Sequence, residues 1–260
     1  MNKTSSQLVK PIFDTTDIES EEPQMESDKH YEQLDLLYNL KWLWAERDDY
    51  YVGANLSIYY NQLEPKKREF IGPDFFLVKN VSAHPRKSWM TWKENNRFPD
   101  LIVEVLSDST RHIDKKKKKE FYQNFFQTPE YFLFDPDSLE FSGFRLVNGK
   151  YEEIQSDEKG LKWSEVLGLY FGIYEDKLRY FSPQGALVPT PEESSTFYEQ
   201  QAKHEKTRAD NEKIRAEKEK MRADNEKMRA EKEKMKAESE RMKTEKLIAQ
   251  LRALGIEPEV

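Results

Sequence analysis

Two carboxylates and one amine stand at positions in this sequence where they could perform metal-assisted chemistry. Glu104 lies within the apolar run LIVEVL, whose residues fill both faces of a predicted central strand. A buried carboxylate is costly unless it is neutralised, paired or bound to a metal ion. Asp74 opens the strand-like run PDFFLV. Two acids on adjacent strands can bind one hard cation, Mg²⁺ or Mn²⁺, which can activate a water for attack on a phosphate.

The amine comes from the lysine tract at residues 115–119. We predict a helix from about 113 to 126, following small polar residues at 107–110 that suit a helix cap. On this helix Asp114, Lys118 and Tyr122 are four residues apart and share one face, while the other four lysines spread over the remaining faces. Lys118 can therefore point toward the acids, where it could orient a metal-bound water or offset negative charge.

Each of these residues also has a structural interpretation. Asp100 competes with Asp74 as the first acid, but four strand residues separate it from Glu104 by roughly 13 Å, so Asp74 is preferred. Glu104 could instead be satisfied by a backbone amide or by Arg111, and a Pro-Asp pair is common turn chemistry. The remaining lysines are interpreted as a solvated helix face. Whether another acid such as Glu46 joins the metal ligands is left open.

The elements that must position these residues predict an α/β fold. A first helix is expected at 30–49, strands at 50–60, 73–78, 88–92, 100–106 and 129–135, and hairpins at 139–154 and 170–182. The strands from 73 to 106 are expected to form a meander, and Asn148-Gly149 is typical of a tight hairpin turn. The helix at 113–126 then crosses between the strand of Glu104 and the next one, which gives a mixed β-sheet core flanked by helices.

Composition divides the chain into four segments. Residues 1–29 are interpreted as a disordered acidic segment, since Asp14 to Lys29 contains seven acidic residues and one basic residue. Residues 30–185 hold all five tryptophans and form the domain that can bury a core. Residues 186–198 are interpreted as a linker. Residues 199–254 form a long charged helix, because Glu, Lys, Arg, Met and Ala dominate there.

The charged helix repeats every seven residues. Ile214, Met221, Met228, Met235 and Met242 recur at one position of the repeat, but the residue three places after each of them is acidic. The apolar stripe is therefore thin for a coiled coil. Glu and Lys pairs three and four residues apart stabilise a long solvated helix. Two interpretations stay open: an arm that forms a homo-oligomer, and an isolated charged helix.

Charge and composition limit the partners and the location. The chain carries a net charge of −7, yet residues 66–119 contain 14 basic and 7 acidic residues. This local basic excess surrounds the strand that carries Glu104 and suits binding to the phosphate backbone of a nucleic acid. The chain has no cysteine, which fits a reducing cytoplasm, and it has no apolar run long enough for a signal peptide or a membrane span. We therefore expect a cytoplasmic protein without a membrane partner.

Several motifs in one order resemble the Uma-two family of restriction-endonuclease-like proteins, within the PD-(D/E)XK nuclease superfamily. They are GPDFFLV, SWMTW, FPDLIVEVLSDST, the Asp, Lys and Tyr spaced by four, PEYFLFDP and FRL. The resemblance extends from about Leu34 to the C-terminal LGIEPEV. The superfamily usually has a lysine two residues after its second acid, but here Leu106 stands at that place.

The resemblance implies a function and a site. It implies a restriction-endonuclease-like fold and a metal-dependent endonuclease that hydrolyses DNA phosphodiester bonds, with Mg²⁺ or Mn²⁺ as cofactor. The family's metal-binding acids fall on Asp74 and Glu104, and its catalytic lysine falls on Lys118 of the following helix. The alternative is a catalytically inactive module that keeps the nuclease fold for binding or assembly and associates through its C-terminal helix.

Overall fold

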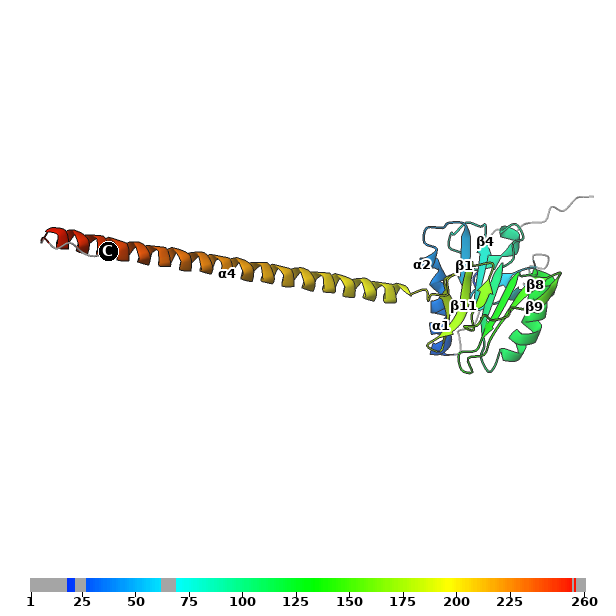
Figure 1. Ribbon diagram of the computed structural model, residues 1–260. Coiled ribbons are helices and arrows are strands. Elements are labelled where there is room, and N and C mark those ends of the chain that lie inside the picture. The colour runs from blue at the N-terminus through cyan, green and yellow to red at the C-terminus, as the bar shows by residue number, and fades with distance from the viewer. Residues whose placement is uncertain (1–17, 22–26, 62–68, 254, 256–260) are drawn as a thin grey trace, which may run out of the picture. The chain divides into compact units, whose positions relative to one another are not determined.

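The computed structural model describes residues 18–21, 27–61, 69–253 and 255, and it divides into two compact units, Met1–Glu192 and Glu193–Val260 (Figure 1). The helical segments are α1 (Asp28–Tyr38), α2 (Leu40–Leu43), η1 (Thr91–Lys93), η2 (Ile113–Lys118), α3 (Lys119–Phe121), η3 (Tyr122–Phe126) and α4 (Pro191–Ala253). The strands are β1 (Tyr50–Ala54), β2 (Ile58–Tyr59), β3 (Phe70–Ile71), β4 (Phe75–Lys79), β5 (Trp89–Met90), β6 (Leu101–Val105), β7 (Glu130–Phe134), β8 (Phe141–Val147), β9 (Lys150–Glu153), β10 (Lys162–Ser164), β11 (Leu169–Tyr174) and β12 (Lys177–Phe181).

The largest sheet of the first unit has six strands in the order β1-β4-β6-β7-β8-β9. Strands β6 and β7 are parallel, whereas every other neighbouring pair in this sheet is antiparallel. The chain between the parallel strands contains the helical segments η2, α3 and η3, which together span the predicted 113–126. The expected mixed sheet and its crossover helix are therefore confirmed.

Side chains alternate between the two faces of this sheet and build two cores. Leu101, Val103 and Val105 point to one core, which also contains residues of α1 and β11. Ile102 points to the other core, together with Tyr122 of the crossover helix. Because strand residues alternate in direction, Glu104 shares the face of Ile102 and lies under the crossover helix.

Two expectations about the first strands are wrong. The run at 50–60 is not one strand, since it divides into β1 and β2. The run at 88–92 does not join the meander either: β5 pairs in parallel with β2, and β2 pairs with β3, in a separate three-stranded sheet. Two-residue strands carry too little pattern to reveal their partners, because pairing is decided by tertiary packing.

The hairpins follow the sequence closely. Strands β8 and β9 meet at Asn148-Gly149, whose φ angles are 51° and 79°. Strands β11 and β12 meet at Glu175-Asp176, whose φ angles are also positive, at 50° and 60°. Positive φ at both central residues is the geometry of the tight turn that matches the twist of a hairpin. The expected turn at Asn148-Gly149 is confirmed.

The ends of the domain differ from the expectation. Within the segment interpreted as disordered, Ile18–Glu21 contact the small sheet: Ser88 Oγ donates to the carbonyl of Ile18 at 2.6 Å, and the amide of Glu21 donates to Ser57 Oγ at 2.9 Å. Residues 1–17 and 22–26 lie outside the described residues.

Helix α4 begins at Pro191, within the expected linker 186–198, because proline suits the first turn of a helix and acidic residues after it are favourable there. The first predicted helix is also divided, since α1 and α2 meet at Asn39 and end by Leu43.

The first testable prediction concerns Gly53, which pairs with Phe76 across β1 and β4. A Cβ atom at residue 53 would lie 2.2 Å from Cε1 of the fully buried Phe76 ring. We expect Gly53→Ala to lower the free energy of unfolding by about 1–3 kcal/mol, because the ring must leave a well-packed position. Urea unfolding followed by tryptophan fluorescence measures this, since all five tryptophans lie in the first unit.

The additional substitution Phe76→Leu provides the control. It makes room for the new methyl group, so we expect Gly53→Ala to cost less in that background than in the wild-type chain. Equal costs in the two backgrounds would show that the ring is not the obstacle.

Across the described part of the chain, none of the helices combines the length and the apolar character that spanning a membrane requires.

Candidate functional site

The structure brings Asp74 and Glu104 together on the helix-covered face of the main sheet. Glu104 lies in β6, and Asp74 immediately precedes β4. Strands β4 and β6 are antiparallel, with Phe75 opposite Val103. One step further along this register places Asp74 opposite Glu104, which explains why the two acids meet.

Backbone amides tie the two carboxylates to each other's strand. The amide of Asp74 donates to Glu104 Oε2 at 3.2 Å, and the amide of Val105 donates to Asp74 Oδ2 at 2.7 Å. Each carboxylate thus accepts a hydrogen bond from the backbone of the strand that carries the other. This reciprocal pair fixes both carboxylates without using a side-chain donor.

Lys118 reaches this acid pair from the crossover helix, as the sequence predicted. Its Nζ atom donates to Glu104 Oε2 at 3.1 Å and to the carbonyl of Gly72 at 3.0 Å, and it lies 3.0 Å from Asp114 Oδ1. Two hydrogen bonds and an ion pair with Asp114 thus surround the ammonium. The ammonium is therefore held at one place beside the acids.

Asp114 and Tyr122 belong to the same site. Tyr122 donates its hydroxyl proton to Glu104 Oε1 at 2.9 Å, and both residues are fully buried. Asp114 is also buried, and its Oδ1 atom has Lys118 beside it but forms no hydrogen bond within the described residues. The spacing of four residues indicated that these side chains share the face of Lys118, but their contacts with Glu104 and Lys118 were not predicted.

The helix that carries these residues is unusual, because η2 and η3 are π-helical and only α3 between them has α geometry. Wide turns of this kind are rare and occur often at functional sites. They still place Asp114 and Lys118, four residues apart, within 3.0 Å of each other.

Burial dominates the electrostatics of the site. It raises the pKa of Glu104 well above 4.5, against the opposing effect of Lys118 and with the help of Asp74 and Asp114. Burial likewise raises the pKa of Asp74, although Lys118 and the amide of Val105 act against it. Burial alone would lower the pKa of Lys118, but Glu104, Asp114 and Asp74 outweigh it and raise this pKa. The site therefore holds more acid than its one ammonium can balance.

The residues of the site differ in their exposure to solvent. The side chain of Glu104 is fully buried, whereas 19% of the Lys118 side chain is exposed and Asp74 and Gly72 are half-buried. Tyr122 is fully buried, and burial and the nearby Glu104 raise its pKa and keep it a neutral donor. A ligand that approaches would thus meet Asp74 and Lys118 before Glu104.

The donor set fits a hard divalent cation held by few protein ligands. Within the described residues, no three His, Cys, Asp or Glu side chains have the geometry of a complete metal centre. Two carboxylates plus water are, however, a common set for Mg²⁺. Asp74 and Glu104 provide such a pair, and the excess of buried carboxylate over ammonium is the charge that a cation would balance.

The other acids considered from the sequence have different roles. Asp100 accepts the amide of Lys79 at 2.7 Å and lies 3.7 Å from Arg97, which supports the preference for Asp74. Arg111 forms an ion pair with Asp135, so it is not the partner of Glu104. Glu46 is exposed in the turn after α2, and no hydrogen bond or ion pair described for the site includes it.

Much of the local basic excess is used in structural contacts. Arg86 pairs with Glu94, and Lys115 pairs with Glu140. Lys119 lies 3.2 Å from the centre of the Phe144 ring. Lys116 and Lys117 are exposed next to Lys118, while residues 66–68 lie outside the described residues. The positive surface beside the site is therefore smaller than the count of charges suggested.

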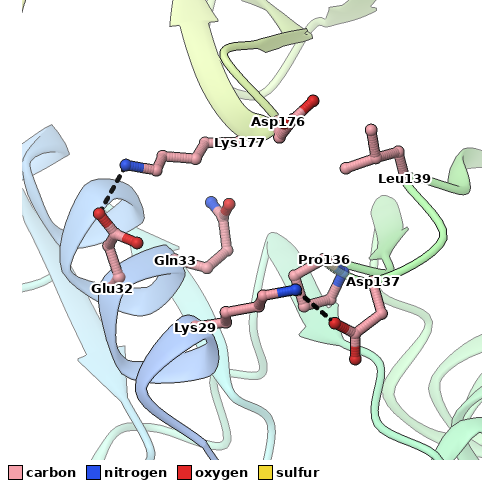
Figure 2. Close-up of a pocket in the computed structure, with 8 residues that line it drawn as sticks. All are labelled: Lys29, Glu32, Gln33, Pro136, Asp137, Leu139, Asp176 and Lys177. Carbon is pink, nitrogen blue, oxygen red and sulfur yellow. Dashed lines mark hydrogen bonds and ion pairs between the residues drawn. The ribbon is translucent and has the colours of Figure 1, made fainter.

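A separate cavity of about 240 Å³ lies between α1 and the turns that follow β7 and β11 (Figure 2). Figure 2 shows the ion pairs of Lys29 with Asp137 and of Lys177 with Glu32 among the residues that line it. These ion pairs use both lysines of the cavity, and none of Asp74, Glu104 and Lys118 lines it. We therefore do not assign it to the same site.

A family model and a solved structure are similar to this chain. The Uma2 family model, described as "Putative restriction endonuclease", matches residues 17–176, which is more than half of the chain. Among solved structures, a nuclease from Anabaena variabilis, described as "putative" and as belonging to DUF820, is similar with a TM-score of 0.41 and 14% identity, over 56% of this chain and 76% of that one. No curated protein matches the chain.

Proposed function

The chain belongs to the Uma2 family, and from that premise we propose that it is a metal-dependent endonuclease that hydrolyses phosphodiester bonds of DNA in the cytoplasm. One observation carries the proposal: Asp74 and Glu104 meet across two strands, and Lys118 Nζ lies 3.1 Å from Glu104 Oε2. Two acids and one amine at a half-open site are the groups that metal-assisted hydrolysis of a phosphodiester requires.

Asp74 and Glu104 would hold the cation, Mg²⁺ or Mn²⁺. When bound, such an ion lowers the pKa of a coordinated water and offsets the charge of the phosphate. In the overall reaction the oxygen of a water bonds to phosphorus and gives up one proton, the ester P–O bond breaks, and the leaving oxygen takes up one proton. Tyr122 holds Glu104 Oε1 and Asp114 holds Lys118, so both keep the reacting groups in place.

Lys118 supplies the positive charge that the protein itself contributes to the site. Its surrounding acids raise its pKa, so it stays an ammonium at neutral pH. A fixed ammonium beside the phosphate stabilises the negative charge that develops during attack. Lys116 and Lys117, exposed on the same turn, would contact neighbouring phosphates of the DNA backbone.

A second candidate function rests on the closure of the site. Both oxygens of the fully buried Glu104 already have partners, namely Tyr122, Lys118 and the amide of Asp74. Such a satisfied network could serve stability alone in an inactive binding or assembly module. The two functions differ in one measurable property, which is cleavage that depends on a divalent cation.

The test uses the full chain with supercoiled plasmid and with single-stranded DNA, in Mg²⁺, in Mn²⁺ and in EDTA. We expect cleavage that requires the cation and that falls at least about 100-fold in Asp74→Asn. Asp100→Asn is the matched control, because each of these aspartates accepts one backbone amide of a neighbouring strand at 2.7 Å. We expect Asp100→Asn to retain cleavage. Absence of cleavage by the wild-type chain, or equal losses in both variants, would favour the inactive module.

A further inference from the structure

Helix α4 presents a regular but unpartnered apolar row. Ile214 and the four following Met residues of the repeat are 51–72% exposed. The row recurs every seven residues from 214 to 242. A strict seven-residue repeat stays on one side of a helix only if the helix supercoils to the left around a partner. The repeat therefore points to a coiled coil, and the charges beside it identify the partner.

The charge pattern distinguishes between the two ways of assigning the repeat. If Met occupied position a, position d would be acidic throughout, which would bury like charges against each other. If Met occupies position d, position a holds Asn211, Lys218, Asn225, Lys232 and Ser239. In a parallel pair Lys218 and Lys232 would also face their own copies, but the other three a residues are uncharged, and a polar Asn or Lys at position a is tolerated at a cost in stability. The second assignment therefore brings like charges together at fewer positions of the seam than the first.

With Met at position d, the flanking positions carry opposite charges without exception. Position g is acidic in every repeat and position e is basic in every repeat. The acidic residues are Asp210, Glu217, Asp224, Glu231 and Glu238, and the basic residues are Arg215, Arg222, Arg229, Lys236 and Lys243. In a parallel pair each g residue faces the e residue five places later in the partner, so Glu217 meets Arg222 and Asp224 meets Arg229.

An antiparallel pair would place these charges differently. There g faces g and e faces e, so acids would meet acids and bases would meet bases along the whole seam. Within one helix, Arg215 already lies 3.6 Å from Glu219 and Arg208 lies 3.7 Å from Glu212, at exposed positions. Exposed ion pairs of this kind contribute little to stability, so they do not prevent these arginines from pairing with acids of a second helix instead.

We propose that α4 is a self-pairing arm that joins two copies of this chain as a parallel, in-register, two-stranded coiled coil. The seam consists of the row from Ile214 to Met242, and the acidic and basic positions beside it set the orientation. The proposal goes beyond nuclease activity and holds whether or not the first unit cleaves DNA. Because α4 follows that unit in the sequence, parallel pairing brings two copies of the unit to the same end of the arm.

The oligomeric state tests the pairing. We expect the full chain to sediment as a dimer at low micromolar concentration. We expect the triple substitution Arg215→Glu, Arg222→Glu and Arg229→Glu to raise the dissociation constant at least about 100-fold, because like charges then face each other at three successive repeats. The matched control is Lys220→Glu, Lys227→Glu and Lys234→Glu, which makes the same change of charge at position c, away from the seam.

A complementary variant separates loss of pairing from loss of the helix. Asp210→Lys, Glu217→Lys and Asp224→Lys should also prevent self-pairing, yet a mixture with the arginine variant should give a heterodimer, because these acids face residues 215, 222 and 229 of the partner. The orientation is tested by Ile214→Cys, since the chain has no cysteine of its own. Parallel pairing brings the two introduced thiols together, so oxidation should give a cross-linked dimer, whereas Lys213→Cys should not.

Three results would overturn the proposal. The first is a wild-type chain that stays monomeric at high micromolar concentration, as an isolated charged helix would. The second is an arginine variant that dimerises as well as the position c control. The third is a dimer in which Ile214→Cys forms no more cross-link than Lys213→Cys, which would show that the helices are not parallel and in register.

Discussion

Glu104→Gln should abolish DNA cleavage and leave the domain folded. The substitution keeps the shape of the side chain: the Gln oxygen can take the place of Oε2 and accept from Lys118 and the amide of Asp74, while its NH2 group donates to the hydroxyl oxygen of Tyr122. It removes the charge that would hold the cation, so we expect cleavage to fall by at least about 1000-fold. The measurement is the rate of plasmid cleavage at saturating Mg²⁺, together with urea unfolding.

The stability of this variant should change by less than about 1 kcal/mol. Lys118 loses its ion pair with Glu104 but keeps the carbonyl of Gly72 as an acceptor and the ion pair with Asp114 at 3.0 Å. Removal of Glu104 also relieves a buried acid whose pKa is raised by burial and by its acidic neighbours. The loss of the ion pair lowers the stability, whereas removal of a buried acid raises it, so the two effects oppose each other.

Glu130→Gln is the matched control, because Glu130 is as buried as Glu104 and lies in the adjacent strand β7. Its carboxylate is bound to Arg145 at 3.1 Å, to the amide of Glu165 at 2.8 Å and to the hydroxyl of Ser164. We expect this variant to lose about 2 kcal/mol of stability, through weakened charge-assisted hydrogen bonds, and to keep its cleavage activity while folded. If Glu104→Gln instead kept its activity and lost stability like Glu130→Gln, Glu104 would be a structural residue.

The positions of the three site residues could be predicted because local patterns decide them. The alternation of side chains along β6 places Glu104 on one face, and the four-residue spacing along the helix places Lys118 on the side that covers this face. The register between β4 and β6 then brings Asp74 opposite Glu104. Each step needs only the type of element and its neighbour in the sheet, and both were evident from the apolar runs.

The details that the sequence did not predict are set by tertiary contacts. Glu104 accepts from Tyr122 through one oxygen and from Lys118 through the other. This arrangement depends on wide π-helical turns, which no residue pattern in the sequence predicts. The docking of Ile18–Glu21 depends on single hydroxyl groups of Ser57 and Ser88. An acidic, polar segment has a composition typical of disorder, and a few hydrogen bonds to a formed domain are enough to change that outcome.

Lys118→Met should destabilise the first unit more than any other change in the lysine tract. The substitution keeps most of the side-chain volume but removes the ammonium, which lies 3.1 Å from Glu104 and 3.0 Å from Asp114. Asp114 Oδ1 would then be buried without a partner within the described residues. We expect a loss of about 3–5 kcal/mol at pH 8, the usual cost of removing one partner from a buried ion pair.

The loss should be smaller at pH 5 than at pH 8. Burial raises the pKa of Glu104 and of Asp74, and Lys118 is the main group that lowers them, so both pKa values rise further without it. The folded variant then binds protons more tightly than the unfolded chain, where these groups titrate near 4.5 and 3.8. Its free energy of unfolding must therefore increase as the pH falls toward 5. Urea unfolding at both pH values, followed by tryptophan fluorescence, measures this difference.

Lys115→Met is the matched control for this prediction, because Lys115 belongs to the same tract but pairs with the half-exposed Glu140. A surface ion pair of this kind contributes less than about 1 kcal/mol. Added Mg²⁺ should recover part of the stability of Lys118→Met, because a cation can balance the acids that the lysine no longer balances, and it should have no such effect on Lys115→Met. Similar stabilities of the two variants at pH 8 would mean that Lys118 does not balance the charge of the buried acids. That result would contradict the proposed role of Lys118 in the site.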